Sequence, residues 1–257
     1  MKSLLKIFNK KESFSSFVKD KKVALVGPAN YLNYFEFGKN IDKYDLVARI
    51  NRGIELVDEN NNSKIGSKTD ILFNCLIEHE DNGGVINIRE LKKNKIKWIC
   101  TTPGSDFSGE SNSNKLSKGV KFLTFLKLKY FFNLHIFDYR KYNNLNKSIR
   151  CRSNTGFSAI FDLLECGAKE IFITGFSFYM DSFFEGYKKG CSRSEEKFAK
   201  DCFSSIRHAQ KNQWEFLKTN KNNPRLRFDP VLSEILNKEK LNRDEFTEII
   251  KLVKSKI

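Results

Sequence analysis

Lys22-Val23-Ala24-Leu25-Val26-Gly27 is the stretch of sequence that decides the fold. Four consecutive apolar residues followed by glycine are typical of a buried parallel strand whose carboxyl end opens into a ligand-facing loop. Apolar runs of similar length recur along the chain with helical segments between them. This alternation predicts an α/β fold built on a doubly wound, mostly parallel sheet. We expect the further strands at residues 44–51, 69–74, 96–101, 134–137, 169–175 and 225–228.

The segments between the predicted strands have helical character. The helix near residues 114–132 is basic and amphipathic, and the one after it is short and apolar. Ser153, Asn154 or Thr155 can cap this short helix. Residues 176–193 are rich in aromatics and glycine without clear periodicity, so they are predicted to be a lid or an active-site loop. We expect the helices at residues 85–93, 114–132, 153–167 and 195–218, followed by C-terminal helices.

Length and composition predict one domain. The 257 residues, 40% of them hydrophobic, can bury one full core but not several independent ones. We expect this domain at residues 21–257. Residues 1–20 place four apolar side chains among lysines and are predicted to be a leader or an interfacial helix. Because no apolar run approaches the roughly 20 residues of a membrane span, we expect a soluble or peripheral protein, and its widely spaced cysteines fit a reduced, cytoplasmic compartment.

The charge predicts an anionic partner. The formal net charge is +15, and residues 115–152 carry ten Lys or Arg against one acid, Asp138. A concentrated positive face suits a nucleotide, an acidic glycan, nucleic acid or a membrane surface, and charge alone does not choose among them. The cysteines give no CxxC pair and no histidine at ligand spacing, so neither a zinc site nor a redox motif is indicated. They are Cys75, Cys100, Cys151, Cys166, Cys191 and Cys202.

Polar segments follow four of the predicted strands and helices. Ligands of open parallel sheets bind beyond the carboxyl ends of the strands, so these segments are expected to meet at one site. They offer amides, hydroxyls, an arginine and a helix N-terminus, which favours an anion. The dinucleotide fingerprint GxGxxG and the phosphate loop GxxxxGK[ST] are both absent. The segments are residues 27–30, 49–53, 153–156 and 175–179.

The order of these segments resembles the sialylmotifs of the eukaryotic-type sialyltransferases, glycosyltransferase family 29. Residues 26–52 and 66–70 are similar to the large sialylmotif, and residues 153–176 to the small one. His208 with Glu215 resembles the terminal His/Glu motif. The spacing of the two residues differs from that of the family, so only the histidine is transferred. The bacterial sialyltransferases of family 42 share the same order, and the resemblance covers roughly residues 21–217.

The resemblance implies a Rossmann-like fold and a function. The expected reaction is metal-independent, inverting transfer of sialic acid or a related ulosonic acid from a CMP-sugar donor to a glycan or glycolipid hydroxyl. No cofactor and no nucleic acid partner are implied. His208 would be the general base, and Tyr179 and Tyr187 would bond the departing phosphate. The implied donor-binding residues are Gly27, Asn30, Arg49, Asn51, Asn154, Thr155, Gly156 and Gly175.

Physical chemistry supports this assignment. Only three histidines exist, and an imidazole titrates near neutral pH, as a base acting on an acceptor hydroxyl should. His79 lies in an acidic stretch and His135 in an apparent strand, so both are interpreted as structural. The negative charge that develops on departing CMP must be met by hydroxyls, amides and cations already in place.

Three alternatives stay open. A retaining CMP-Kdo transferase would need a carboxylate nucleophile such as Asp181 or Glu185. A nucleic-acid-binding module would use the basic residues 115–152, but it lacks recognised stacking or zinc motifs. A catalytically inactive sugar-nucleotide binder would bind CMP without turnover.

Overall fold

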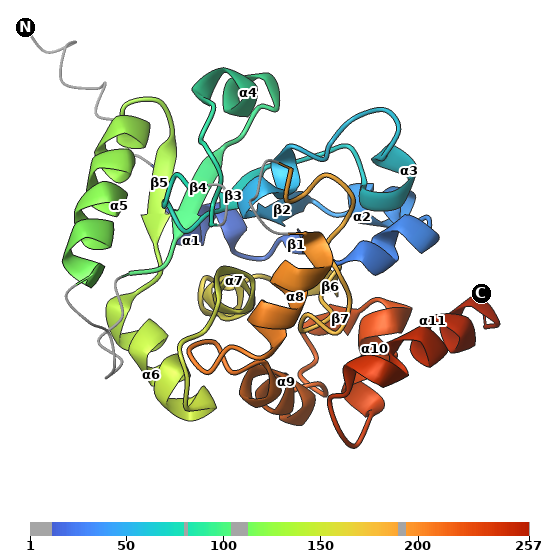
Figure 1. The fold of residues 1–257 in the computed structure, drawn as a ribbon. Helices are drawn as coiled ribbons and strands as arrows, with labels where there is room; N and C mark the ends of the chain where they lie inside the picture. The colour runs from blue at the N-terminus through green and yellow to red at the C-terminus, as the bar shows by residue number, and fades with distance from the viewer. Residues whose placement is uncertain (1–11, 80–81, 104–112, 190–193, 257) are drawn as a thin grey trace, which may run out of the picture.

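The computed structural model describes residues 12–79, 82–103, 113–189 and 194–256. Within this part, seven strands form one sheet in the order β5-β4-β3-β2-β1-β6-β7, and every pairing is parallel (Figure 1). The predicted parallel sheet and each of its expected strands are thereby confirmed. The strands are β1 Lys22–Val26, β2 Leu46–Ile50, β3 Ile71–Phe73, β4 Trp98–Thr101, β5 Asn133–Ile136, β6 Glu170–Thr174 and β7 Leu226–Phe228.

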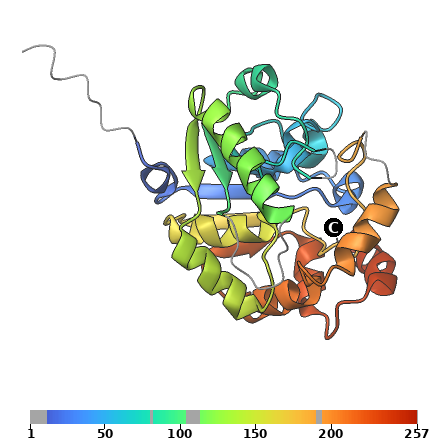
Figure 2. The same ribbon diagram turned by 60° about the vertical axis from the view of Figure 1, so that its left-hand side comes forward.

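Helices cover both faces of the sheet. The segments with α2, α4 and α5 lie on one side, and α6, α7 and α9 lie on the other (Figure 2). None of the described helices is both long enough and apolar enough to cross a bilayer. The helices are α1 Phe14–Val18, α2 Gly38–Asp42, α3 Asn62–Ile65, α4 Ile88–Lys93, α5 Ser113–Lys129, α6 Tyr139–Ile149, α7 Thr155–Glu165, α8 Glu195–Phe203, α9 Gln210–Thr219, α10 Pro230–Asn237 and α11 Phe246–Lys254, with 3-10 turns η2 Asn30–Tyr34, η3 Asn51–Ile54 and η4 Arg243–Glu245.

The winding of the sheet reverses between β1 and β6. The chain builds outward from β1 to β5, and then crosses back to place β6 on the other side of β1. These two strands pair over their whole length, from Lys22 opposite Glu170 to Val26 opposite Thr174. In a doubly wound sheet this is the point where loops diverge and leave a crevice for ligand.

The fold includes part of the expected leader. Phe14 and Val18 of α1 are 3% and 0% exposed, and Phe14 stacks on His135 with 4.3 Å between ring centroids. A short helix that buries two of its five residues gains far more from packing than from its own hydrogen bonds. The compact unit therefore starts before residue 21, and residues 1–11 lie outside the described part.

The single helix predicted at residues 195–218 is two helices. α8 ends at Phe203, α9 begins at Gln210, and His208 lies in the turn between them rather than on a helix. Ser205 Oγ accepts a hydrogen bond from the backbone N–H of His208 at 3.3 Å. Serine side chains compete in this way with helical hydrogen bonds, and the prediction of one continuous helix was wrong for this reason.

The helix predicted at residues 114–132 is confirmed as α5, but its apolar residues are not confined to one face. Its Leu128 is fully buried and Phe125 packs against the same small apolar cluster. Phe122 and Leu123 on its other side are 60% and 66% exposed. Because Leu128 packs against the sheet, the helix has a fixed orientation. In that orientation the side chain of Lys121 points toward the carboxyl edge of the sheet.

Candidate active site

The carboxyl ends of β1 and β6 meet a cavity of about 310 Å³. Gly27 and Gly175 follow these strands and touch each other. A Cβ on Gly27 would lie 2.3 Å from Gly175 O, and one on Gly175 would lie 2.4 Å from Gly27 O. Gly175 also has a φ of +75°, which favours glycine. The pair joins the two strand ends beside the cavity, and of the two only Gly175 lines it.

The amino end of α7 supplies one wall of the cavity. Asn154 caps the helix, because its Oδ1 accepts a hydrogen bond from the backbone N–H of Phe157 at 2.8 Å. Thr155 and Gly156 follow it along the wall. A Cβ on Gly156 would lie 2.9 Å from the ring of Phe176, so glycine lets the ring rest on the helix. The first backbone N–H groups of this 11-residue helix and its dipole suit a phosphate or a carboxylate.

The segment after β6, predicted as a lid or an active-site loop, forms another wall. Phe178 and Tyr179 have φ values of +50° and +58°, which are rare for bulky residues and common at functional sites. An antiparallel bridge between Ala29 and Phe183 ties the segment to the loop after β1. Phe178, Phe183 and Tyr187 are 7%, 4% and 3% exposed. In its described part, the segment is therefore a packed wall, and residues 190–193 lie outside that part.

The two predicted tyrosines both line the cavity. Burial raises the pKa of Tyr179 well above its ordinary value, and negative charge on Cys202 or Tyr187 acts in the same direction. Burial also raises the pKa of Tyr187, although a hydrogen bond with Asn51 opposes the shift. Both phenols therefore keep their hydrogen at neutral pH. Tyr187 Oη donates it to Ile50 O over a long 3.5 Å, a bond that it would exchange for one to a bound anion. Asn51 itself lines the cavity, where its Oδ1 accepts a hydrogen bond from Cys75 N at 3.0 Å.

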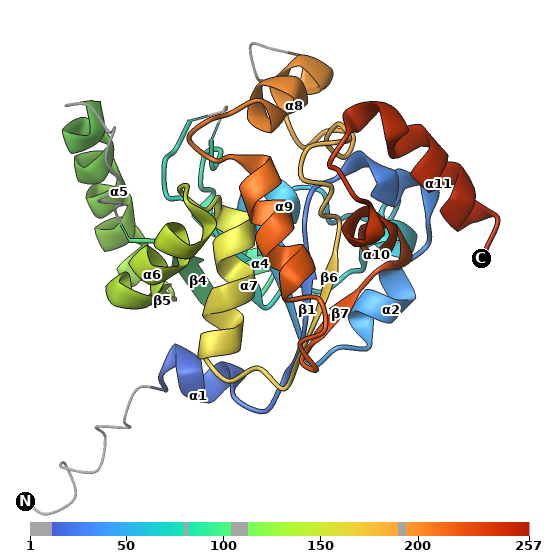
Figure 3. The same cartoon turned by 90° about the horizontal axis from the view of Figure 1, so that it is seen from below.

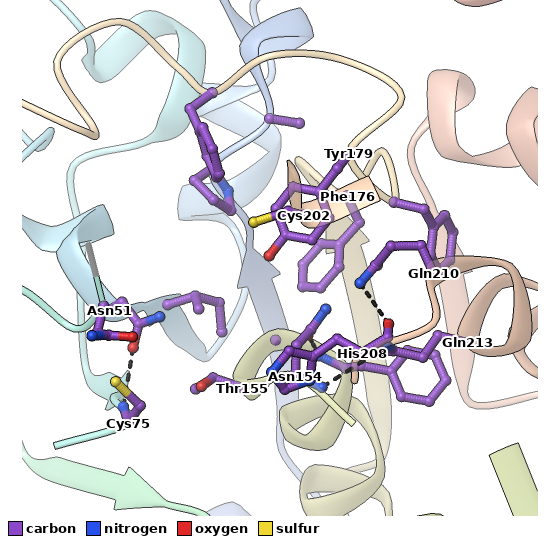
Figure 4. Close-up of a pocket in the computed structure, with 18 of the residues that line it drawn as sticks. Asn51, Cys75, Asn154, Thr155, Phe176, Tyr179, Cys202, His208, Gln210 and Gln213 are labelled. Carbon is purple, nitrogen blue, oxygen red and sulfur yellow. Dashed lines mark hydrogen bonds between the residues drawn. The ribbon is translucent and has the colours of Figure 1, made fainter. Parts of the chain in front are cut away.

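His208 lines the same cavity from the turn before α9. Its Nδ1 lies 2.8 Å from the carbonyl oxygen of Arg152. A carbonyl can only accept, so Nδ1 carries the hydrogen and Nε2 carries the lone pair, as a base requires. The side-chain amides of Gln210 and Gln213 donate to His208 O, and Gln213 Oε1 accepts from Asn154 N at 3.3 Å (Figure 4). Gln213 thus connects the histidine turn to α7.

Four cations line the cavity, and no carboxylate does so among the described residues. Burial lowers the pKa of Lys121 to about 8, with repulsion from Arg152 adding to the shift and Cys75 opposing it. Lys188 is 6% exposed, and its ammonium lies 4.0 Å from the ring centroid of Phe198. A second cavity of about 220 Å³ shares Tyr179 and His208 with the first and adds one acid, Asp201. The four cations are Lys121, Arg152, Lys188 and Arg207.

Arg49, which was predicted to bind the donor, is buried away from the cavity and makes structural hydrogen bonds. Its side chain is 1% exposed and does not line the cavity. Nε donates to Thr69 Oγ1 at 2.8 Å, and Nη2 donates to the carbonyls of Ile65, Gly66 and Lys68 at 2.9, 2.9 and 3.0 Å. These bonds tie β2 to the turn before β3. The motif gave the position of the arginine on a strand, but not the direction of its side chain.

Eight of the eleven predicted residues line the cavity. Besides Arg49, the exceptions are Gly27, which acts through backbone contact, and Asn30. The Nδ2 of Asn30 donates to Tyr34 Oη at 3.3 Å, and its Oδ1 accepts from Asn33 at 2.9 Å, so its amide serves the η2 turn. Sequence reasoning missed the four cations and both glutamines. The basic stretch was a signal for Lys121 and Arg152, whereas nothing in the sequence marked Gln213.

Comparisons with known proteins identify the fold. No protein-family model matches the sequence, and a search of curated proteins gave no match. The structure is similar to the monofunctional alpha-2,3-sialyltransferase Cst-I from Campylobacter jejuni, with 18% identity, a TM-score of 0.53, and coverage of 81% of this chain and 74% of that one. It is also similar to the C. jejuni sialyltransferase CstII in complex with the substrate analogue cytidine-5'-monophosphate, with 16% identity, a TM-score of 0.50, and coverage of 82% and 79%. The chain has the α/β fold of these sialyltransferases, as the sequence resemblance predicted.

Proposed function

We propose that this protein is a glycosyltransferase that moves sialic acid or a related ulosonic acid from a CMP donor to a glycan hydroxyl. The observation that carries the proposal is the cavity at the reversal point of the sheet, where a helix N-terminus, four cations and an imidazole meet. Such a lining suits a ligand with a phosphate and a carboxylate. The shared fold of CstII, whose solved structure holds CMP, supports the choice of nucleotide.

The chemistry assigned to the site is a single displacement. Nε2 of His208 removes the proton of the acceptor hydroxyl, whose oxygen forms a bond to the anomeric carbon of the donor. The bond from that carbon to the phosphate oxygen breaks, and its electron pair leaves with CMP. The Tyr179 and Tyr187 hydroxyls and the cavity cations stabilise the departing phosphate. Because His208 and Tyr179 line both cavities, the smaller one offers space for the acceptor. One displacement inverts the anomeric configuration.

The alternatives gain less support from the same residues. Neither Asp181 nor Glu185 lines the cavity, and Asp181 Oδ1 accepts a hydrogen bond from Ser182 N at 2.8 Å. A retaining route through either carboxylate therefore lacks a placed nucleophile. The nucleic-acid alternative requires the basic residues 115–152 to form a binding surface. Lys121 and Arg152 of that stretch instead face the cavity. An inactive CMP binder is separated from an enzyme by turnover alone.

A thermal-shift comparison of CMP with UMP, AMP and GMP tests the nucleotide. CMP at about 100 times its Kd is expected to add about 2.7 kcal/mol to the free energy of unfolding, which is a rise in Tm of roughly 5–10 °C for a chain of this size. The same comparison with CMP-sialic acid and CMP-Kdo, followed by analysis of the product, identifies the sugar. Equal shifts with all four nucleotides, or none with CMP, would contradict the proposal.

The affinity for CMP is expected to fall as the pH rises from 7 to 9. The pKa of Lys121 is lowered to about 8, so its charge is present below that pH and is lost above it. Losing one charge-assisted hydrogen bond weakens binding by about tenfold. Lys121→Met should bind CMP more weakly and lose this pH dependence. Lys129→Met, an exposed lysine of the same helix, is the matched control, and titration calorimetry at several pH values measures all three proteins. A pH dependence that persists in Lys121→Met would rule out this lysine.

A further inference from the structure

A cluster of metal-ligand types lies outside the cavity, between α7 and the edge strand β5. His135 Nε2 is 2.9 and 3.0 Å from the two carboxylate oxygens of Asp162. Cys166 Sγ is 3.7 Å from Asp162 Oδ1, and the ligand atoms of these three residues all lie within 4.8 Å of one another. None of the three lines the cavity. The reaction proposed above makes no use of them.

Secondary structure brings the cluster together and adds a fourth group. Asp162 and Cys166 are four residues apart, so they share one face of α7. His135 of β5 pairs in register with Cys100 of β4, so both side chains leave the same face of the sheet. Cys100 is fully buried, and Asp162 and Cys166 are 2% and 8% exposed. Phe14 stacks on the His135 ring and fixes its plane. One nitrogen, one carboxylate and one sulfur therefore converge, and Cys100 leaves the same face of the sheet beside them.

We propose that this cluster is a structural zinc site, with His135, Asp162 and Cys166 as ligands and Cys100 moving in to complete a tetrahedron. Imidazole, carboxylate and thiolate are the ligands that Zn²⁺ prefers, and its bonds of roughly 2.0–2.3 Å place tetrahedral ligand atoms about 3.3–3.7 Å apart. The 2.9 to 3.7 Å separations around Asp162 are close to that geometry, and His135 and Cys166, which lie within 4.8 Å of each other, need to approach by up to about 1 Å. On binding, the thiols release their protons to solvent. The His135 ring at the sheet edge is partly exposed, which gives the ion an entry path.

The ion would join β5 to the helix whose amino end forms a wall of the active site. α7 runs from the cavity at Asn154 down to Cys166 beside α1 (Figure 3). A metal at its carboxyl half would hold the helix against β4 and β5 without touching a substrate. The inference is independent of the proposed transferase activity, because its readouts are metal content and stability. The spacing of the cysteines in the sequence gave no sign of it, since the four groups come from three separate elements.

Metal analysis of the full-length protein tests the site. Protein purified without chelator is expected to contain about one zinc per chain, and Zn²⁺ added to the chelated protein should raise Tm by at least about 5 °C at saturation. Substituted Co²⁺ should give a thiolate-to-metal charge-transfer band. Cys166→Ala should lower the Zn²⁺ affinity by at least about 100-fold. Even mutation of residues that only hydrogen-bond to the metal ligands lowers metal affinity by about 10- to 100-fold. Cys202→Ser, a partly exposed cysteine elsewhere, should bind Zn²⁺ as the unchanged protein does.

The outcomes separate the site from its rivals. His135→Gln provides a second variant if Cys166→Ala does not fold, and circular dichroism reports folding for each. Zinc that binds equally to Cys166→Ala or His135→Gln would place the ion elsewhere and overturn the proposal. Absence of a stoichiometric Tm rise with Zn²⁺, or a Co²⁺ spectrum without the thiolate band, would leave His135 and Asp162 as a simple hydrogen-bonded pair.

Discussion

His208→Ala is expected to slow sugar transfer by about 100- to 10,000-fold, the usual worth of a positioned general base. The imidazole lines both cavities, and its Nδ1 hydrogen is donated to Arg152 O at 2.8 Å, so in the neutral ring Nε2 is the nitrogen that can accept a proton. CMP binding should change little, because the phosphate is assigned to the helix N-terminus, the cations and the phenols. Single-turnover rates with CMP-sialic acid, beside calorimetric CMP affinities, measure the two effects separately.

Three further measurements distinguish a base from a residue that merely holds its turn. His79→Ala, an exposed histidine outside the cavity, is the matched control and should keep the full rate. In the unchanged protein the rate should fall at acidic pH, and that limb of the profile should vanish in His208→Ala. Added imidazole should restore part of the rate. If His208→Ala lost CMP affinity and transfer in parallel, the histidine would be a structural residue of the donor site.

The sheet was predictable because buried parallel strands have a strong local signal. β1 buries four consecutive apolar residues and β2 buries all five of its residues, which appears in the sequence as short apolar runs between helical segments. The break between α8 and α9 was not predictable from periodicity. It depends on Ser205 bonding to the backbone of His208, and a helical pattern continues on either side of it.

The active site was predictable only where backbone position decides function. Asn154, Thr155 and Gly156 follow from the rule that ligands meet the loops and helix starts at the carboxyl edge of a parallel sheet. The direction of a long side chain depends on packing that no local pattern records. Arg49 turns into the protein to satisfy three carbonyls, and Lys121 turns into the cavity from a helix whose Lys127 and Lys129 are exposed.

Gly27→Ala is expected to destabilise the protein strongly. Its Cβ would lie 2.3 Å from Gly175 O and 2.8 Å from the Phe176 ring. The carbonyl of Gly175 cannot withdraw freely, because it accepts the backbone N–H of Ala29 at 3.0 Å, and Gly27 N itself bonds to Thr174 O at 2.8 Å. Forcing a methyl group into such a space lowers the free energy of unfolding by about 3 kcal/mol. That loss lowers Tm by roughly 6–12 °C.

Gly53→Ala is the matched control for this prediction, since the added Cβ would meet only the Arg49 Cβ at an ordinary 3.5 Å. Gly53 lies in the η3 turn without a positive φ, so alanine there should be neutral or stabilise the protein by up to about 1 kcal/mol. Calorimetric melting compares the two variants, and CMP titration follows in whichever folds. Because Gly27 touches Gly175, a lining residue, its variant should also bind CMP less well. Equal melting temperatures for the two variants would contradict this prediction. They would mean that β1 and β6 can move apart at their carboxyl ends at little cost, so that the close contact of the two glycines does not fix the edge of the cavity.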